Sequence, residues 1–209
     1  MASPAAARET LLMSTPLELP LPGRATYADL EALPERYLGE LIGGTLHAKA
    51  RPALPHALAA SALGAFLFGA FNRRQGEEGG PPGGWWILDE PELHFGSDVL
   101  VPDIAGWRRE RLPQIPAEPW MELAPDWVCE VSSPATWQLD RTVKLDTYFT
   151  QGVGHVWFVE PSTRRIEVLR HTAEGWLLVA NHFHEEVVGI EPFAGVPLAL
   201  EALWVSKEG

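Results

Sequence analysis

Two acidic residues and one lysine near the middle of the chain are of the types that phosphoryl chemistry uses. Asp103 lies in the sequence VPDIAGW, Glu130 in APDWVCEVSSP and Lys144 in LDRTVKLDTY. Divalent magnesium prefers carboxylate oxygens and lowers the pKa of a bound water. A nearby lysine could orient that water or stabilise the charge that develops on phosphate oxygens. These three residues therefore predict a site for a divalent metal ion and a phosphate.

Both acids lie in or beside short apolar runs. The runs Val99–Val101 and Ile104–Trp107 surround Asp103, and the run Trp127–Val131 contains Glu130. Runs rich in β-branched and aromatic residues and bounded by proline are typical of strands buried in a sheet. On adjacent strands the two carboxylates could share one cation if their oxygens lay about 3 to 5 Å apart, given magnesium–oxygen bonds of about 2.1 Å. Burial beside another acid should then raise the pKa of at least one of them.

Lys144 lies in a predicted helix over Leu139–Gln151. Its apolar residues recur at helical spacing and are expected in the core: Leu145, Tyr148 and Phe149. The opposite face carries polar residues at i, i+4, i+7 and i+11: Asp140, Lys144, Thr147 and Gln151. We expect this face to turn toward Asp103 and Glu130, so that Lys144→Ala slows turnover with little effect on folding. The alternative is an ion pair between Lys144 and Asp140 on a solvated helix face, worth a few tenths of a kcal/mol.

Glu40 is a third candidate carboxylate. It lies in the sequence YLGELIGGTLHAKA of residues 37–50. There Gly43-Gly44 predicts a hairpin turn between the strands Glu40–Ile42 and Thr45–Ala48. From the residues alone, a solvated strand residue is the simpler interpretation of Glu40, since surface carboxylates are common.

Two helices are predicted in the first third of the chain. Thr26 is expected to cap a short helix that has Asp29 at its third position. Pro55 predicts the start of a helix over His56–Phe71, which is apolar almost all round. The predicted helix of 16 residues is shorter than the roughly 18 residues that a bilayer demands, so we expect a largely buried helix against the sheet and no membrane partner. His56 could contact a phosphate, although a helix-terminal histidine is more often structural.

The remaining apolar runs predict a chain rich in strands. The expected strands are Trp85–Leu88, Glu92–Phe95, Val99–Trp107, His155–Glu160, Arg165–Arg170 and Trp176–Ala180, followed by a short helix near Leu198–Leu203. Composition predicts loops at residues 73–84 and 108–122. We expect residues 1–25 to form an extended or partly disordered arm and residues 26–209 to form a single mixed α/β domain.

The composition is that of an ordinary globular protein, with 46% hydrophobic and 21% charged residues. The net charge of −12 argues against a broad basic surface for nucleic acid and lowers the expectation that long duplex DNA is the substrate. The single cysteine, Cys129, cannot form an internal disulfide, and the N-terminus is unlike a signal peptide, so we expect a cytoplasmic protein. Cys129 is expected in the core, as are three strand tryptophans: Trp107, Trp127 and Trp157.

Several stretches together resemble the Uma2 family, which belongs to the PD-(D/E)XK nuclease superfamily. They are Pro102-Asp103, the stretch from Pro125 to Pro134, Asp140, Lys144 and Tyr148 with Gly152-Val153, and Trp157-Phe158-Val159. The resemblance covers roughly residues 26 to 200. It implies a mixed β-sheet flanked by helices, with a restriction-endonuclease-like core, and a phosphodiesterase site that uses Mg²⁺, with Mn²⁺ as an alternative ion.

The resemblance also implies roles for individual residues. By position, Asp103 and Glu130 match the two metal-binding acids, and Glu40 matches the acid of the N-terminal element. The superfamily pattern has a lysine two residues after the second acid, where this chain has Ser132. Lys144 resembles the migrated lysine that this branch of the superfamily uses instead.

Three functions are compatible with these residues. The first is a metal-dependent endonuclease that cuts DNA, and the second is a catalytically weak nucleic-acid or nucleotide-binding module that keeps the fold. Retention of both acids and a lysine favours the enzyme, whereas the acidic net charge favours the module. The third, a glycoside hydrolase that uses Asp103 and Glu130, lacks any sugar-binding signature. We also expect a homodimer, because a two-fold arrangement would let two sites address both strands of a duplex.

Overall fold

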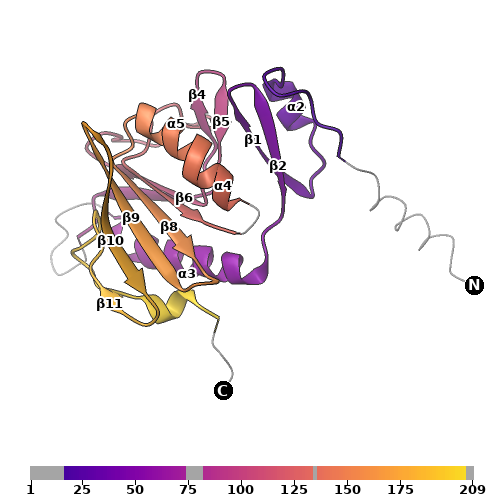
Figure 1. The fold of residues 1–209 in the computed structure, drawn as a ribbon. Coiled ribbons are helices and arrows are strands. Elements are labelled where there is room, and N and C mark those ends of the chain that lie inside the picture. Colours follow the sequence, from indigo (N-terminus) through magenta and orange to yellow (C-terminus); the bar gives the residue numbers. More distant parts are fainter. Residues whose placement is uncertain (1–16, 74–81, 134–135, 206–209) are drawn as a thin grey trace, which may run out of the picture.

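The computed structural model describes residues 17–73, 82–133 and 136–205, which fold into β-sheets with helices packed around them (Figure 1). In chain order the elements are α2 (Tyr27–Glu31), β1 (Tyr37–Ile42), β2 (Thr45–Ala50), α3 (Leu54–Phe71), β3 (Trp85–Asp89), β4 (Leu93–Phe95), β5 (Asp98–Leu100), β6 (Ile104–Arg108), β7 (Trp127–Val131), α4 (Trp137–Leu139), a π-helical turn η1 (Asp140–Lys144), α5 (Leu145–Thr150), β8 (His155–Glu160), β9 (Arg165–Thr172), β10 (Gly175–Phe183), β11 (Val187–Val188), β12 (Leu198–Ala199) and a 3₁₀ turn η2 (Leu200–Leu203).

The larger sheet has six strands in the order β10-β9-β8-β7-β6-β3. Strands β7 and β8 are parallel, and the other neighbouring pairs are antiparallel. The helical segment α4–η1–α5 makes the crossover that a parallel pair requires. The sequence WVCEV of β7 is buried along its whole length, as expected for a strand that is covered on both faces. The mixed α/β architecture is thus as predicted.

Alternate residues of β7 face two different parts of the core. Trp127, Cys129 and Val131 pack with residues of α3, whereas Val128 packs with Tyr148 of α5. Helices α3 and α5 therefore cover opposite faces of the larger sheet, and Figure 1 shows them well separated. Glu130 lies two residues after Val128, so its side chain points to the α5 face.

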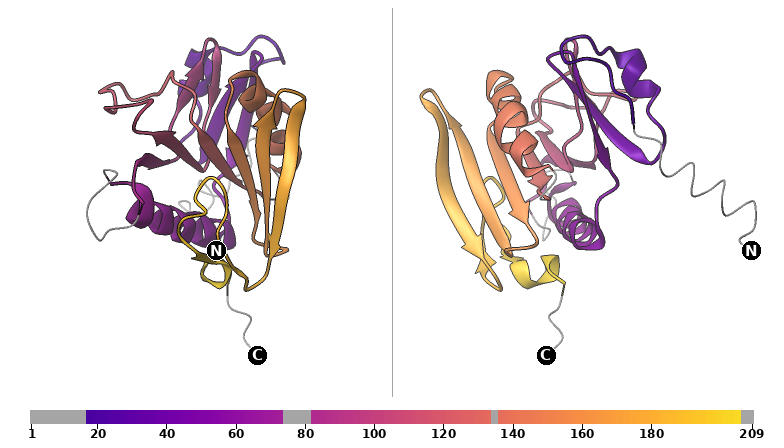
Figure 2. Two further views of the ribbon diagram at one scale, coloured as in Figure 1. Left: turned by 90° about the vertical axis from the view of Figure 1, so that its left-hand side faces the viewer. Right: turned by 45° about the vertical axis from the view of Figure 1, so that its right-hand side comes forward.

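A smaller sheet, in the order β2-β1-β5-β4, lies beside α5 at the end of the molecule away from β10 (Figure 2). Its β1–β2 hairpin turns at Gly43 and Gly44, whose φ angles are 57° and 68°. Positive φ at both positions is what a two-residue hairpin turn requires, and glycine adopts it readily. On one face of β1, Leu41 packs with residues of α2, whereas Ile42 on the other face packs in the same cluster as Tyr148. The predicted hairpin is confirmed, with longer strands.

Helix α3 is only partly buried, so the prediction of a largely buried helix is wrong. It has 18 residues with a mean hydropathy of 1.6, and 33% of them are buried. It is also the one helix of the described chain that is long and apolar enough to cross a membrane. The buried residues are Ala59, Leu63, Gly64, Leu67, Ala70 and Phe71, which lie on one side of the helix. This side packs against the larger sheet, while nothing in the described chain covers the opposite side.

The segment predicted as one α-helix over Leu139–Gln151 contains a π-helical turn. Asp140–Lys144 form this turn between the short α4 and α5. Residues spaced by four lie on one side of an α-helix, and the more loosely wound π turn, with its i→i+5 hydrogen bonds, keeps them there. Asp140, Lys144 and Tyr148 are consequently all buried, while Gln151 is exposed. The prediction that Tyr148 lies opposite to Lys144 is therefore wrong.

Other expectations have mixed outcomes. Trp107, Trp127, Trp157 and Cys129 are buried, as predicted. The predicted strand Val99–Trp107 is divided, because Val101-Pro102-Asp103 separates β5 from β6. The predicted C-terminal helix is a 3₁₀ turn that follows the short strand β12. Residues 1–16 of the predicted arm and 74–81 of the first predicted loop lie outside the described residues, so the division of the chain at residue 25 stays a prediction.

Candidate active site

Strands β6 and β7 place the two predicted metal-binding acids opposite each other. Ile104 pairs with Cys129 in the antiparallel register, so Asp103 lies opposite Glu130 where β6 begins. The Asp103 carboxylate is fixed by two donors. The backbone N–H of Val131 donates to Oδ2 at 2.7 Å, and Oδ1 lies 2.9 Å from Nε2 of His56 in the first turn of α3.

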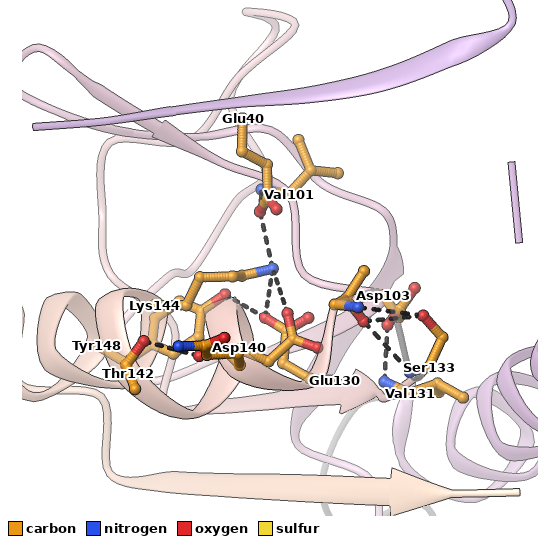
Figure 3. Close-up of polar contacts among 12 residues, drawn as sticks. Glu40, Val101, Asp103, Glu130, Val131, Ser133, Asp140, Thr142, Lys144 and Tyr148 are labelled. Atoms are coloured by element: carbon orange, nitrogen blue, oxygen red, sulfur yellow. Dashed lines mark hydrogen bonds and ion pairs between the residues drawn. The ribbon is translucent and has the colours of Figure 1, made fainter. Parts of the chain in front are cut away.

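Lys144 links Glu130 to Glu40 of the smaller sheet (Figure 3). Its Nζ lies 2.7 Å from Glu40 Oε1 and 2.8 Å from Glu130 Oε1. The hydroxyl of Tyr148 donates to the same Glu130 oxygen at 2.6 Å, and the backbone N–H of Val101 donates to Glu40 Oε1 at 2.8 Å. The site thus joins β1, β7 and η1, and neither Glu40 nor Lys144 is a surface residue.

Burial excludes a solvated ion pair between Lys144 and Asp140. The two side chains are 0% and 2% exposed, and Nζ lies 3.9 Å from Asp140 Oδ1, farther than from Glu40 or Glu130. Residues of η1 and α5 that face the site are Asp140, Lys144 and Tyr148. Of the polar face predicted from an α-helical period, Thr147 instead donates from its hydroxyl to the carbonyl of Val143.

Burial and neighbouring charges shift the pKa values of the acids in opposite directions. Burial raises the pKa of Glu130 to about 8, against the opposing charge of Lys144 and together with the repulsion of Asp140, Asp103 and Glu40. This agrees with the prediction that one of the paired acids has a raised pKa. Burial would raise the pKa of Asp103 too, but the hydrogen bond and charge of His56 outweigh it and hold that pKa below its ordinary value.

Lys144 remains a cation in this environment. Burial alone would lower its pKa, but the negative charges of Glu130, Glu40 and Asp140 outweigh burial and raise the pKa above its ordinary value. The fully buried ammonium is therefore a fixed positive charge at the centre of the acids.

The oxygens of the site are carboxylates, the ligands that a hard divalent cation prefers. Three acids lie within 4.0 Å of the buried Lys144 Nζ: Glu40, Glu130 and Asp140. Asp140 Oδ1 is a buried oxygen with no hydrogen-bond partner among the described residues. Within the same residues, no group of three or more His, Cys, Asp or Glu side chains is placed to hold a metal ion. Magnesium commonly binds through one or two carboxylates and completes its shell with water and substrate phosphate. The separation of the Asp103 and Glu130 oxygens stays a prediction.

Two residues near the site were missed at the level of sequence. Tyr148 is buried in the core as predicted, but its spacing of four from Lys144, and of eight from Asp140, is a recognisable signal that it also faces the site. Lys49 of β2 was not singled out. The two-residue turn at Gly43-Gly44 sets the register of the hairpin, which pairs Lys49 with Leu38 and so places it on the Glu40 face.

Comparisons with known proteins agree with this fold. The family model described as "Uma2: Putative restriction endonuclease" matches residues 24–201. The chain is also similar to a solved structure described as a "putative nuclease belonging to DUF820" from Anabaena variabilis ATCC 29413. The TM-score is 0.66 and the identity 22%, over 85% of this chain and 96% of that chain. This likeness supports a restriction-endonuclease-like fold, as predicted, whereas no curated protein matches the chain.

Proposed function

Because the chain belongs to the Uma2 family, we propose that it is a magnesium-dependent endonuclease that hydrolyses phosphodiester bonds in DNA. The observation that carries the proposal is the meeting of Glu40, Glu130 and Lys144 from three separate segments, with Asp103 opposite Glu130. The nuclease-like fold supports hydrolysis of a nucleic acid.

The residues of the proposed site have distinct roles. Asp103 and Glu130 would hold the metal ion, which when bound lowers the pKa of a water ligand and polarises the phosphate. The N–H of Val131 orients Asp103, and the hydroxyl of Tyr148 orients Glu130. Lys144 opposes the protonation of Glu130 and adds positive charge that stabilises the charge developing on phosphate oxygens.

A cleavage assay tests the proposal directly. The purified protein is incubated with linear, supercoiled and single-stranded DNA in the presence of Mg²⁺, Mn²⁺ or EDTA. We expect cleavage with either metal ion and none in EDTA. Asp103→Asn should abolish cleavage, whereas Asp146→Asn, which removes an exposed carboxylate of α5, should not. Binding without cleavage under every condition would favour a nucleic-acid-binding module instead.

The proposal includes a homodimer joined through α3. Its uncovered side is an apolar line in which Leu54, Leu58 and Phe68 are 84%, 41% and 56% exposed. The helix contains no Asp, Glu, Lys or Arg, whereas the whole chain has a net charge of −12. Two copies of this acidic chain can therefore approach along α3 without bringing like charges together, so a second copy is the occupant that we propose.

We also propose that the protein acts in the cytoplasm. Its single cysteine, Cys129, is free and buried, and burial raises the pKa of the thiol. A fold that contains no disulfide suits a reducing compartment. Fractionation of cells that make the protein is the measurement that tests this location.

A further inference from the structure

Lys49 shares one face of the β1–β2 hairpin with Glu40. The register pairs Glu40 with His47 and Leu38 with Lys49. Paired residues of an antiparallel hairpin, and residues two apart on one strand, lie on the same face. Lys49 is therefore on the face from which Glu40 reaches the buried ammonium of Lys144.

The two lysines of the site have different environments. Lys144 is fully buried and has two carboxylates within 3 Å, at 2.7 and 2.8 Å. Lys49 is half-buried, and among the described residues no carboxylate lies within 4.0 Å of its ammonium. Its charge still acts on Asp103 and Asp140 at longer range. Lys49 is thus the lysine whose charge is available to a ligand at the site.

Two cavities meet at Lys49. The larger has a volume of about 460 Å³ and the smaller about 260 Å³, and Leu38, Lys49 and Asp103 line both of them. Asp103 is thereby the one candidate metal-binding acid that lines both spaces. A third cavity, of about 790 Å³, lies beside Arg108 at the other end of β6, and none of the candidate acids lines it.

The two cavities at Lys49 differ in charge. Apart from the shared residues, the polar side chains that line the larger cavity can donate hydrogen bonds: Arg51, His56, Ser133 and Thr136. The smaller cavity is lined by carboxylates: Glu31, Glu40, Glu90 and Glu92. An anion is attracted by the first set and repelled by the second. The volume of the larger cavity is also within the range of small-molecule binding sites, roughly 300 to 1,000 Å³.

We propose that the larger cavity is a phosphate-binding subsite, in which Lys49 binds a backbone phosphate of the nucleic-acid strand next to Asp103. This inference rests on the proposed function and deepens it. The ammonium of Lys144 is buried and paired with Glu40 and Glu130, so its charge acts on the strand only at a distance. Lys49 instead contacts the phosphate of the strand directly. Arg51 and the hydroxyls of Ser133 and Thr136, which line the same cavity, provide further hydrogen-bond donors.

The test measures binding without turnover. A short fluorescein-labelled single-stranded oligonucleotide is titrated with wild-type protein and variants in EDTA, and its fluorescence anisotropy is followed at several salt concentrations. Lys49→Ala should weaken binding about tenfold or more, as loss of a hydrogen bond to a charged group does. The slope of log affinity against log salt should fall by about 0.7 for the lost phosphate contact. Lys49→Arg should keep the wild-type slope, because it keeps the charge.

The matched control is Arg24→Ala, which removes an exposed cation that lines neither cavity. It should leave the affinity and the slope unchanged. If Lys49→Ala binds with wild-type affinity and slope, or if Arg24→Ala weakens binding equally, the subsite is overturned. If Lys49 governs binding but the wild type cleaves no DNA with Mg²⁺ or Mn²⁺, the subsite stands and the proposed nuclease function fails.

Discussion

The two acids Glu130 and Asp103 lie opposite each other but have pKa values shifted in opposite directions. Glu130 Oε1 receives two donors, Lys144 Nζ at 2.8 Å and the Tyr148 hydroxyl at 2.6 Å, and yet burial keeps the pKa of Glu130 raised. Asp103, which lies opposite Glu130, has a lowered pKa because the hydrogen bond from His56 outweighs its burial. The pKa values of the two acids are therefore shifted in opposite directions. A cation bound between them would favour ionisation of both.

The raised pKa of Glu130 predicts how stability depends on pH. The pKa rises from 4.5 to about 8 on folding, so the native state binds more protons than the unfolded state between these values. Proton binding by Glu130 therefore stabilises the native state fully below about pH 4.5, and this contribution to the free energy of unfolding is lost as the pH rises through about 8. Glu130→Gln should remove this contribution. Urea unfolding of both proteins in EDTA, at several pH values between about 5 and 8, should show that the variant's free energy of unfolding declines less. Parallel pH profiles would contradict the prediction.

Lys144 should be required for folding as well as for activity, contrary to the expectation from sequence. Lys144→Met keeps an unbranched side chain but leaves Glu40 and Glu130 without their nearest positive charge. Removing one partner of a buried ion pair costs about 3 to 5 kcal/mol. Urea unfolding should show a loss of this size, together with a loss of cleavage of roughly 10² or more.

Two further variants serve as controls for Lys144→Met. Lys49→Met makes the same change at a half-buried lysine without an ion pair among the described residues, so the free energy of unfolding should change little. The double variant Lys144→Met, Glu130→Gln should lose less stability than the sum of the single variants, because the neutral amide no longer needs a counter-charge. Additive losses would show that Lys144 and Glu130 are not coupled.

At the level of elements, local patterns predicted most of the fold but not which residues of the site helix face Glu130. Trp127–Val131 was predicted with its observed bounds, and Gly43-Gly44 predicted the hairpin, because alternation and turn glycines act within a few residues. The π turn at Asp140–Lys144 has no such local signal. The π turn is not the reason that Tyr148 is misplaced, because a spacing of four puts Tyr148 on the side of Lys144 in an α-helix as well. The error comes from grouping the tyrosine with the apolar residues Leu145 and Phe149. Lys49 could have been found, since the hairpin register alone puts it on the Glu40 face.

The β1–β2 hairpin carries both Glu40 and Lys49, and its turn can be tested with two neighbouring glycines. Both have positive φ, so Gly43→Ala and Gly44→Ala should each destabilise the protein by about 1 to 2 kcal/mol. A Cβ on Gly44 would also lie 3.0 Å from the backbone carbon of Gly23, whereas one on Gly43 would meet nothing within 4 Å. Gly44→Ala should therefore lose clearly more free energy of unfolding. Equal losses would show that the Gly23 contact is unimportant.

At the scale of the whole molecule, the site lies between the two sheets and takes residues from both. Glu40 comes from the smaller sheet, Glu130 from the larger one, and Lys144 from the crossover between β7 and β8. The ion pairs of Lys144 therefore hold the two sheets together, and the site is complete only when both are in place. On the far side of the larger sheet, α3 is covered on one face only. The first turn of α3 reaches the site through His56, whereas the rest of its uncovered side lies away from Glu130 and Lys144.

The uncovered face of α3 predicts how the molecule assembles. Phe68→Glu places a charge in the centre of the proposed two-fold contact, where two copies would bring like charges together, and should convert a dimer into a monomer. Light scattering of the eluting peak in size-exclusion chromatography measures the mass. Leu178→Glu is the matched control, because Leu178 of β10 is exposed to a similar extent, 50% against 56%, on a different part of the surface. A monomeric wild type, or a dimer that only Leu178→Glu disrupts, would show that α3 is not the dimer interface.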